Sequence, residues 1–328
     1  MAVSRITRRN FLRAGAAALL PCFPSCDRRK PPTTAAAEAF HWSGIGFGID
    51  MSMEIHGVDR GKGERLGTTC EDTIRSLEQA FSLYQENSEL RILNRERVLR
   101  HPSPLFRELL TLSLDLHRRT SGSFNPAVHG AWQWLQERGS SDGLADDPQW
   151  SKLIAATDPK FIDFSSAVRL RHPLTQLSMN AIGQGFLADT VAARLRAEGV
   201  TTAMLHLGES LAIGSHPEGR PWRLAVMGTP VDGETDLVGS IEFADAGLAV
   251  SANEADRILI DPVAGRVHRR ARVAAVVSAE GAAVADAFAT AFGAAPRDEW
   301  KCLVSSLEEG GASQVHVWEN NVPALRKP

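Results

Sequence analysis

The sequence contains little that would indicate a specialised class of protein. Among its 328 residues are only four cysteines and one tyrosine, and the formal net charge of −3 gives no basic excess that would favour nucleic acid as a partner. The body of the chain has no apolar run of 18 residues, so no membrane-spanning helix is expected there. With 43% apolar and 23% charged residues, the composition is that of a globular protein.

The N-terminal segment differs from the rest of the chain. Arg8 and Arg9 lie in the run TRRNFLR, and the apolar stretch from 14 to 20 that follows is too short to span a bilayer. This order is typical of a twin-arginine secretory signal, although a chance basic N-terminus is the alternative. We therefore expect a periplasmic protein with a signal and linker over 1–38 and a single domain over 39–328.

The cysteines leave two questions open. Cys22 and Cys26 are candidates for lipidation and so for a membrane anchor, although neither lies in a good lipobox. Cys70 and Cys302 are far apart in the sequence. A disulfide between them and a free buried pair are both compatible with an exported protein, because a bridge requires the two Cα atoms to be close in space.

The most informative stretch is 177–214, which contains closely spaced glycines. Gly183 and Gly185 stand where apolar residues at helical spacing begin, and Gly199 is placed to end that helix. A strand over 204–207 and a turn over 208–210 are expected next. Glycines at a helix N-terminus favour a phosphate site, but an ordinary connection between a helix and a strand is about equally compatible with them.

Helices and strands follow one another elsewhere without strict alternation, which favours the α+β class. The pattern predicts helices opening at a capping box at Thr68 and at Pro104, and a hairpin over 161–171. Short strands are expected from 222 onward, with Leu303 and 314–318 closing the sheet. An alanine-rich helix is expected over 283–292.

That last helix carries two polar residues in apolar surroundings. Asp286 and Thr290 are four residues apart and therefore share one helix face. A buried carboxylate requires compensation, and a carboxylate with a hydroxyl group suits a hard cation such as Mg²⁺. The alternative is an aspartate capped by a backbone N–H, with Thr290 bonded back along its own helix.

Six segments in order carry a resemblance to a known family. They are FSLYQENSELRILN, TSGSFNPAVHGAW, MNAIGQGFLAD, LHLGESLAIG with GRPWRLAV, ILIDPVAG and ADAFATAF, within Trp42 to Pro296. Together they resemble the ApbE-type FAD:protein FMN transferases. Gln184 and the pair Gly208-Glu209 are similar to the subgroup that accompanies maturation of nitrous oxide reductase.

The resemblance implies a T-fold-like mixed sheet core with packed helices, and an enzyme that transfers FMN from FAD to a Thr or Ser hydroxyl of an exported or membrane flavoprotein, releasing AMP. It implies Mg²⁺ on Asp286, Thr290 and the backbone carbonyl of Gly183. It assigns FAD binding to Phe47, Tyr84, Ser123, Phe124, Asn125, Asn180, Phe186 and Ile260. An FAD pyrophosphatase that gives FMN and AMP, or a non-catalytic flavin-binding maturation factor, are the alternatives.

The chain departs from the family pattern at several positions. Phe47-Gly48-Ile49 stands where Met-Gly-Thr is common, and Asn125 and Ser210 each stand where an aspartate is usual. Ile258 replaces a histidine of many members, so the general base is open, with His206 and His268 as candidates that lack positional support. Asp261 is retained, but a turn role suits it as well as a catalytic one.

Overall fold

The computed structural model describes residues 39–228, 235–253, 258–267 and 272–328. The predicted leader with Arg8, Arg9, Cys22 and Cys26, and also His268, lies outside these ranges. Within them, no helix combines the length and the apolar character needed to cross a bilayer.

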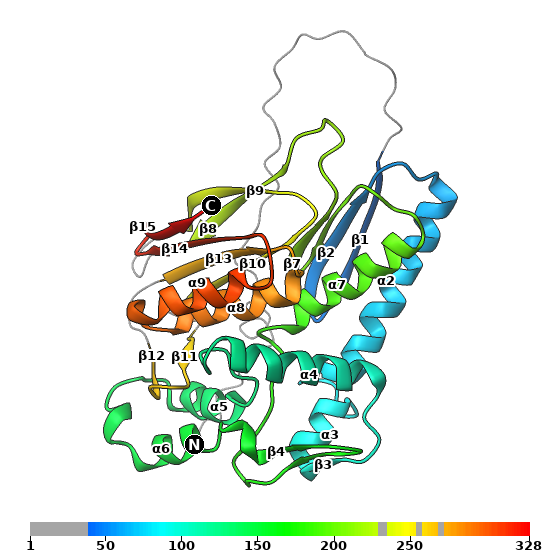
Figure 1. The fold of residues 1–328 in the computed structure, drawn as a ribbon. Coiled ribbons are helices and arrows are strands. Elements are labelled where there is room, and N and C mark those ends of the chain that lie inside the picture. Colours follow the sequence, from blue (N-terminus) through cyan, green and yellow to red (C-terminus); the bar gives the residue numbers. More distant parts are fainter. Residues whose placement is uncertain (1–38, 229–234, 254–257, 268–271) are drawn as a thin grey trace, which may run out of the picture.

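An eight-stranded sheet forms the centre of the molecule, and its neighbouring strands all pair antiparallel (Figure 1). Its spatial order is β1 (Phe40–Gly46), β2 (Ile49–Ile55), β6 (Ala203–Leu207), β7 (Glu209–Ile213), β10 (Gly247–Asn253), β13 (Arg272–Ser278), β14 (Ser313–Glu319) and β15 (Val322–Lys327). Side chains alternate between two cores, as the period of a strand requires. In β13, Ala274 and Val276 enter one core, whereas Val273, Ala275 and Val277 enter the other.

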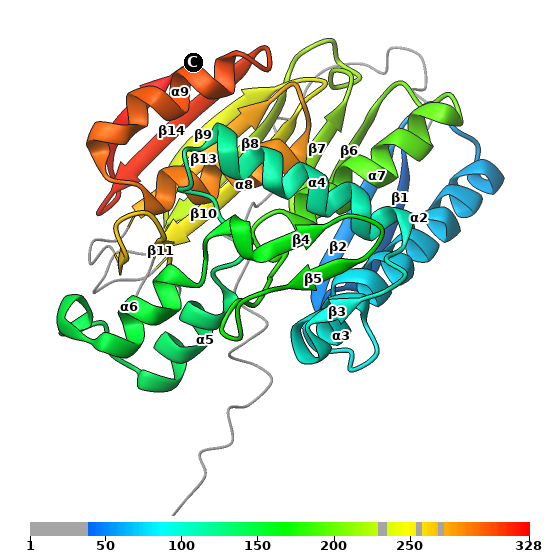
Figure 2. The ribbon, with the colours of Figure 1, turned by 60° about the horizontal axis from the view of Figure 1, so that its bottom comes forward.

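Helices cover one face of this sheet and a hairpin covers the other. The helices against the sheet are α2 (Arg60–Phe81), α7 (Gly183–Ala197), α8 (Ala282–Ala294) and α9 (Trp300–Glu308). The hairpin of β8 (Trp222–Gly228) and β9 (Asp236–Phe243) encloses the second core. Helix α4 (Pro104–Arg119) packs on α2, α8 and α9 and forms an outer helical layer, which Figure 2 shows in front of α8.

Smaller elements lie on the side of α8 and α4 that faces away from the sheet (Figure 1). They are α3 (Glu89–Glu96), α5 (His129–Arg138), α6 (Pro148–Ala155), a three-stranded sheet of β3 (Val98–Leu99), β5 (Val168–Leu170) and β4 (Ile162–Phe164), and the pair β11 (Ile260–Asp261) and β12 (Arg266–Val267). Leu135, Trp150 and Ile260 belong to a third small core that joins α5, α6 and β11.

The α+β class and the sheet core with packed helices are confirmed, whereas several element boundaries were wrong. Helix α2 begins at Arg60 because Asp59 accepts a hydrogen bond from the Lys62 backbone N–H at 2.8 Å. Thr68 instead donates its hydroxyl to the Glu64 carbonyl inside that helix. Leu303 lies in α9 and not in a strand.

Two further expectations are corrected. The turn before β7 is confined to Gly208, which has φ 96°, so Glu209 and Ser210 already belong to the strand. Cys70 and Cys302 are both free, and since Cys70 is buried and Cys302 exposed, they form neither a disulfide nor a buried pair.

The first turn of α8 is held from two sides by backbone. A Cβ atom on Gly185 of α7 would lie 2.3 Å from the Ala282 carbonyl oxygen, and one on Gly247 of β10 would lie 2.2 Å from the Ala282 nitrogen. Asp189 of α7 caps this turn, because its carboxylate accepts from the N–H groups of Ala282 at 2.7 Å and Ala283 at 2.9 Å. The position of α8 is therefore set by direct contact with its neighbours.

Candidate active site

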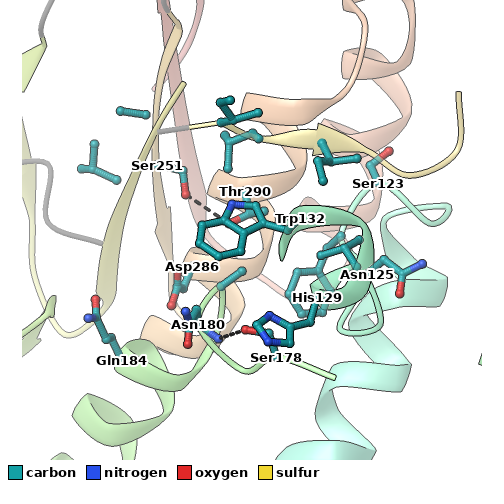
Figure 3. Close-up of a pocket in the computed structure, with 18 of the residues that line it drawn as sticks. Ser123, Asn125, His129, Trp132, Ser178, Asn180, Gln184, Ser251, Asp286 and Thr290 are labelled. Carbon is teal, nitrogen blue, oxygen red and sulfur yellow. Dashed lines mark hydrogen bonds between the residues drawn. The ribbon is translucent and has the colours of Figure 1, made fainter. Parts of the chain in front are cut away.

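A cavity of about 180 Å³ opens between α8, β10, α5 and the loop that leads into α7. The residues expected from the resemblance that line it are Ser123, Phe124, Asn125, Asn180, Ile260, Asp286 and Thr290. Figure 3 shows Trp132 and His129 entering from α5, with Asp286 and Thr290 coming from α8. Segments more than 150 residues apart in the sequence thus meet around one space.

A second, smaller cavity contains the remaining expected residues except one. Phe47, Tyr84 and Gly183 line it, together with Asn180 and Gln184, which also line the first cavity. The two cavities therefore adjoin at Asn180 and Gln184. Phe47 lies in the tight turn between β1 and β2, where its backbone N–H donates to Glu78 Oε1 at 2.7 Å.

Phe186 lines neither cavity. Its side chain is buried in the main core, where its ring meets that of Phe81 edge to face with centroids 6.3 Å apart. The helical spacing of apolar residues in α7 predicted this packing role, and it does not support a side-chain contact with FAD.

Asp286 is a buried carboxylate with little compensation. The residue is only 4% exposed, and the one hydrogen bond of its side chain among the described residues, from the Gly185 N–H to Oδ2, is 3.4 Å long. Burial, together with the negative charge of Asp189, raises the pKa of Asp286 to about 7. The expected alternative of a well-capped aspartate therefore receives only weak support.

Thr290 lies one turn further along α8 and faces the same cavity. Its hydroxyl is 3.1 Å from the Ser251 hydroxyl of β10, as the dashed line in Figure 3 marks. A bond from Thr290 back along its own helix was the alternative at the sequence level. The contact instead links the helix to the sheet beside Asp286.

Glu209 is a functional candidate that sequence reasoning missed. It lies at the start of β7, lines the cavity of Asp286 and is also 4% exposed. Its Oε2 atom accepts from the Val250 N–H at 3.1 Å. Burial and the charge of Asp286 raise the pKa of Glu209 well above its ordinary value. The signal in the sequence was an acidic residue within the apolar run LHLGESLAIG.

His129 and Trp132 were also missed, although they stand in a segment that carries the resemblance. They are three residues apart on α5, and their rings stack with centroids 6.2 Å apart. Burial and the nearby positive charge of Arg91 lower the pKa of His129 to about 4. The ring is therefore neutral near pH 7 and a weaker base than an ordinary histidine. A histidine within the apolar run AVHGAW was the available signal.

Other predicted polar residues have structural partners. His206 lines neither cavity and bonds to the Ser210 hydroxyl at 2.9 Å, so it does not replace the histidine missing at Ile258.

Asp261 accepts from the N–H groups of Val263 and Ala264, which is a turn role. Asn125 accepts from the Ala127 N–H and donates to the Thr157 carbonyl, so its amide fixes the cavity wall.

The residues around Asp286 fit a hard divalent cation. No cluster of three or more His, Cys, Asp or Glu side chains suited to a metal occurs in the described part of the chain. The cavity nevertheless combines two buried carboxylates with the Thr290 hydroxyl, and no lysine or arginine lines it among the described residues. Oxygen ligands with uncompensated negative charge are what Mg²⁺ prefers.

Comparison with known proteins identifies a family and several relatives. A model described as the ApbE family matches residues 47–313. An FAD:protein FMN transferase of Escherichia coli K12 is 24% identical over 303 residues, covering 86% of each chain. One from Rhodobacter capsulatus is 26% identical over 280 residues, covering 80% of this chain, which spans only 52% of that relative.

A solved structure shares the fold. The flavin transferase ApbE from Vibrio cholerae superimposes with a TM-score of 0.69 at 20% identity, covering 85% of this chain and 93% of its own. The family model covers well over half of the sequence. This chain therefore belongs to the ApbE family of flavin transferases.

Proposed function

We propose that this chain transfers FMN from FAD to a Thr or Ser hydroxyl of an acceptor protein and releases AMP. The single observation that carries the proposal is the pair of adjoining cavities, which meet at Asn180 and Gln184 beside the carboxylate of Asp286. The printed names of the relatives, FAD:protein FMN transferase, support the same reaction.

The two cavities suit a substrate with two ring systems joined by a pyrophosphate. Phe124 and Trp132 offer aromatic surface in the first cavity, and Phe47 and Tyr84 offer it in the second. Tyr84 is 56% exposed, so it stands at the rim. The amide side chains of Asn180 and Gln184 lie between the two aromatic surfaces, where the pyrophosphate would pass.

Charge makes a cation necessary for this substrate. A pyrophosphate is anionic, and the described lining of the first cavity offers carboxylates and no lysine or arginine. In the proposal, Asp286, Thr290 and the Gly183 carbonyl hold Mg²⁺, which when bound neutralises the pyrophosphate and polarises its phosphorus. Gly183 lines the adjoining cavity, at the side where Gln184 belongs to both.

The chain itself supplies positioning of the reacting groups. In the transfer, the acceptor hydroxyl oxygen bonds to the FMN phosphorus while the bond to the AMP oxygen breaks, and the hydroxyl proton must leave. Neutral His129 is the one described histidine in the lining, and we assign it a hydrogen bond to that hydroxyl, whose proton passes to water because the lowered pKa of the ring makes it a weak base. The closed first turn of α8 keeps Asp286 and Thr290 fixed during the reaction.

The test is an assay of the purified full chain with FAD, MgCl₂ and a flavoprotein domain that has a candidate Thr or Ser. Covalent flavin on the acceptor, seen by in-gel fluorescence, with AMP released in equal amount, is expected. Asp286→Ala should lower the rate by at least 10²–10³-fold, about the loss seen when one charge-stabilising group is removed. Free FMN and AMP without labelled acceptor would establish a pyrophosphatase instead. Bound but unchanged FAD would establish a binding protein.

We further propose a periplasmic location and an exported or membrane-bound acceptor. The TRRNFLR leader supports this, and the similarity of Gln184 and Gly208-Glu209 to the nitrous oxide reductase subgroup suggests the acceptor's pathway. Changing Arg8 and Arg9 together to Lys should stop export, which fractionation of expressing cells would measure. Unchanged export would remove the twin-arginine assignment.

A further inference from the structure

Glu209 occupies a position that a purely structural carboxylate rarely has. It is buried to 4% exposure, yet it lines the cavity of Asp286 and Thr290. One of its oxygens accepts from the Val250 N–H, while the other has no hydrogen-bond partner among the described residues. Strand β7 contacts α8 directly, and both carboxylates line the same cavity, Glu209 from the sheet and Asp286 from the helix.

Nothing in the described lining balances this pair. Two buried carboxylates of like charge repel each other, and an uncompensated buried charge costs several kcal/mol. The described lining has no lysine or arginine, and the aromatic ring of His129 is held neutral by burial. Two arrangements remain: either a cation lies between the carboxylates, or one of them keeps a proton.

We infer that Glu209 is a second carboxylate ligand of the divalent cation that Asp286 and Thr290 hold. The inference rests on the proposed function, whose ligand set contains a single carboxylate. A hard cation takes six oxygen ligands, and Glu209 adds a buried one from strand β7. Two carboxylates give the site enough negative charge to retain the cation before FAD arrives.

The decisive variant is Glu209→Gln, because glutamine has nearly the same shape. Its amide oxygen still accepts from the Val250 N–H, so the fold is preserved, and circular dichroism and urea unfolding verify this. Glutamine also mimics a protonated glutamate, whose hydrogen-bonding capacity it shares but whose charge it lacks. The variant therefore separates a ligand from a proton-bearing side chain.

The experiment is calorimetric titration of Mn²⁺ and Mg²⁺ into the chelator-stripped full chain without FAD. Glu209→Gln and Asp286→Asn should each weaken binding by at least ten- to a hundredfold, the range that even outer-shell partners of a metal contribute. The matched control is Glu54→Gln on β2, which removes a carboxylate bonded to His56 outside both cavities. It should bind like the unaltered chain.

The outcomes separate the inference from the proposed function. If Glu209→Gln binds both ions normally while Asp286→Asn does not, Glu209 is no ligand and the inference is wrong, but the cation site of the proposed function stands. If neither variant loses affinity, the cation assignment itself fails. Equal losses in both variants support the second ligand.

Discussion

Carboxylates are buried at two places near α8, and the two places differ in whether a basic side chain is paired with the carboxylate. Near the C-terminal end of α8, Glu319 is paired with Arg272 at 2.8 Å and with Arg297. Burial raises the pKa of Glu319, but the hydrogen bonds from Arg297 and Arg272 outweigh it and leave the pKa below its ordinary value. At the cavity, Glu209 and Asp286 have raised pKa values and no basic partner in the described lining.

The difference separates a structural charge from a functional one. Arg272 also donates to the carbonyls of Phe292, Gly293 and Ala295, so it completes the end of α8 as well as neutralising Glu319. The chain thus supplies its own cation where a buried carboxylate only holds the fold together. At the cavity the described lining supplies no basic side chain, so the negative charge of Glu209 and Asp286 remains available to bind a ligand.

The largest expected effect comes from breaking the ion pair between Glu319 and Arg272. Arg272→Met removes an arginine paired with the buried Glu319 and three hydrogen bonds to carbonyls, so the free energy of unfolding should fall by about 3–5 kcal/mol. Urea unfolding measures this. The remaining folded protein should keep its FAD turnover, since Arg272 lines neither cavity. A loss below 1 kcal/mol would show that the pair contributes little.

A smaller effect concerns how the ionisation of Asp286 in the cavity makes stability depend on pH. The pKa of Asp286 is about 7 in the folded chain and 3.8 as the reference value, so folding favours its protonated form. Stability without metal should therefore be greatest below pH 4 as far as this group is concerned, and should fall as pH rises toward 7. Asp286→Asn should flatten that fall, which urea unfolding in EDTA between pH 5 and 7.5 measures.

The cation should reverse this loss. At pH 7.5, Mg²⁺ at a hundred times its dissociation constant should stabilise the unaltered chain by about 2.7 kcal/mol, and should stabilise Asp286→Asn by about half of that or less. Equal stabilisation of both proteins would place the ion elsewhere.

The smallest effect concerns Asp189, which lies between the two cases because its buried carboxylate accepts backbone N–H groups. Burial raises the pKa of Asp189 to about 6, although its carboxylate accepts N–H groups of Ala283 and Ala282. Asp189→Asn keeps one acceptor oxygen and loses one bond, so unfolding should become easier by about 1 kcal/mol. Thermal unfolding measures it. A loss as large as that of Arg272→Met would class Asp189 with the balanced carboxylates.

Local pattern predicted much of the fold. The helix over α8, the helix from Pro104 and the hairpin of β4 and β5 all follow from spacing and turn residues. The beginning of α2 did not, because Thr68 and Glu71 resemble a capping box although Asp59 is the actual cap. Competing caps nine residues apart differ by about 1 kcal/mol at most, and packing of the first turns decides between them.

The site was predictable only where chemistry and spacing coincide. Asp286 and Thr290 could be recognised in the sequence, since they are polar, one helical turn apart and surrounded by apolar residues. Glu209 and His129 do not, because their roles depend on β7 and α5 meeting α8 across more than 70 residues of sequence. For Phe186 the apolar spacing indicated the core, where its side chain lies, whereas the resemblance suggested FAD.

The contact of Gly185 and Gly247 with Ala282 has a consequence for how the enzyme would meet its substrates. Because backbone contacts backbone there, helix α8, which carries Asp286, cannot move closer to its neighbours when a substrate binds. Free and loaded forms should superimpose along α8, and any adjustment should fall to the opposite walls, where α5 and the Asn180 loop stand. The acceptor protein would then approach a surface already in its working shape on one side only.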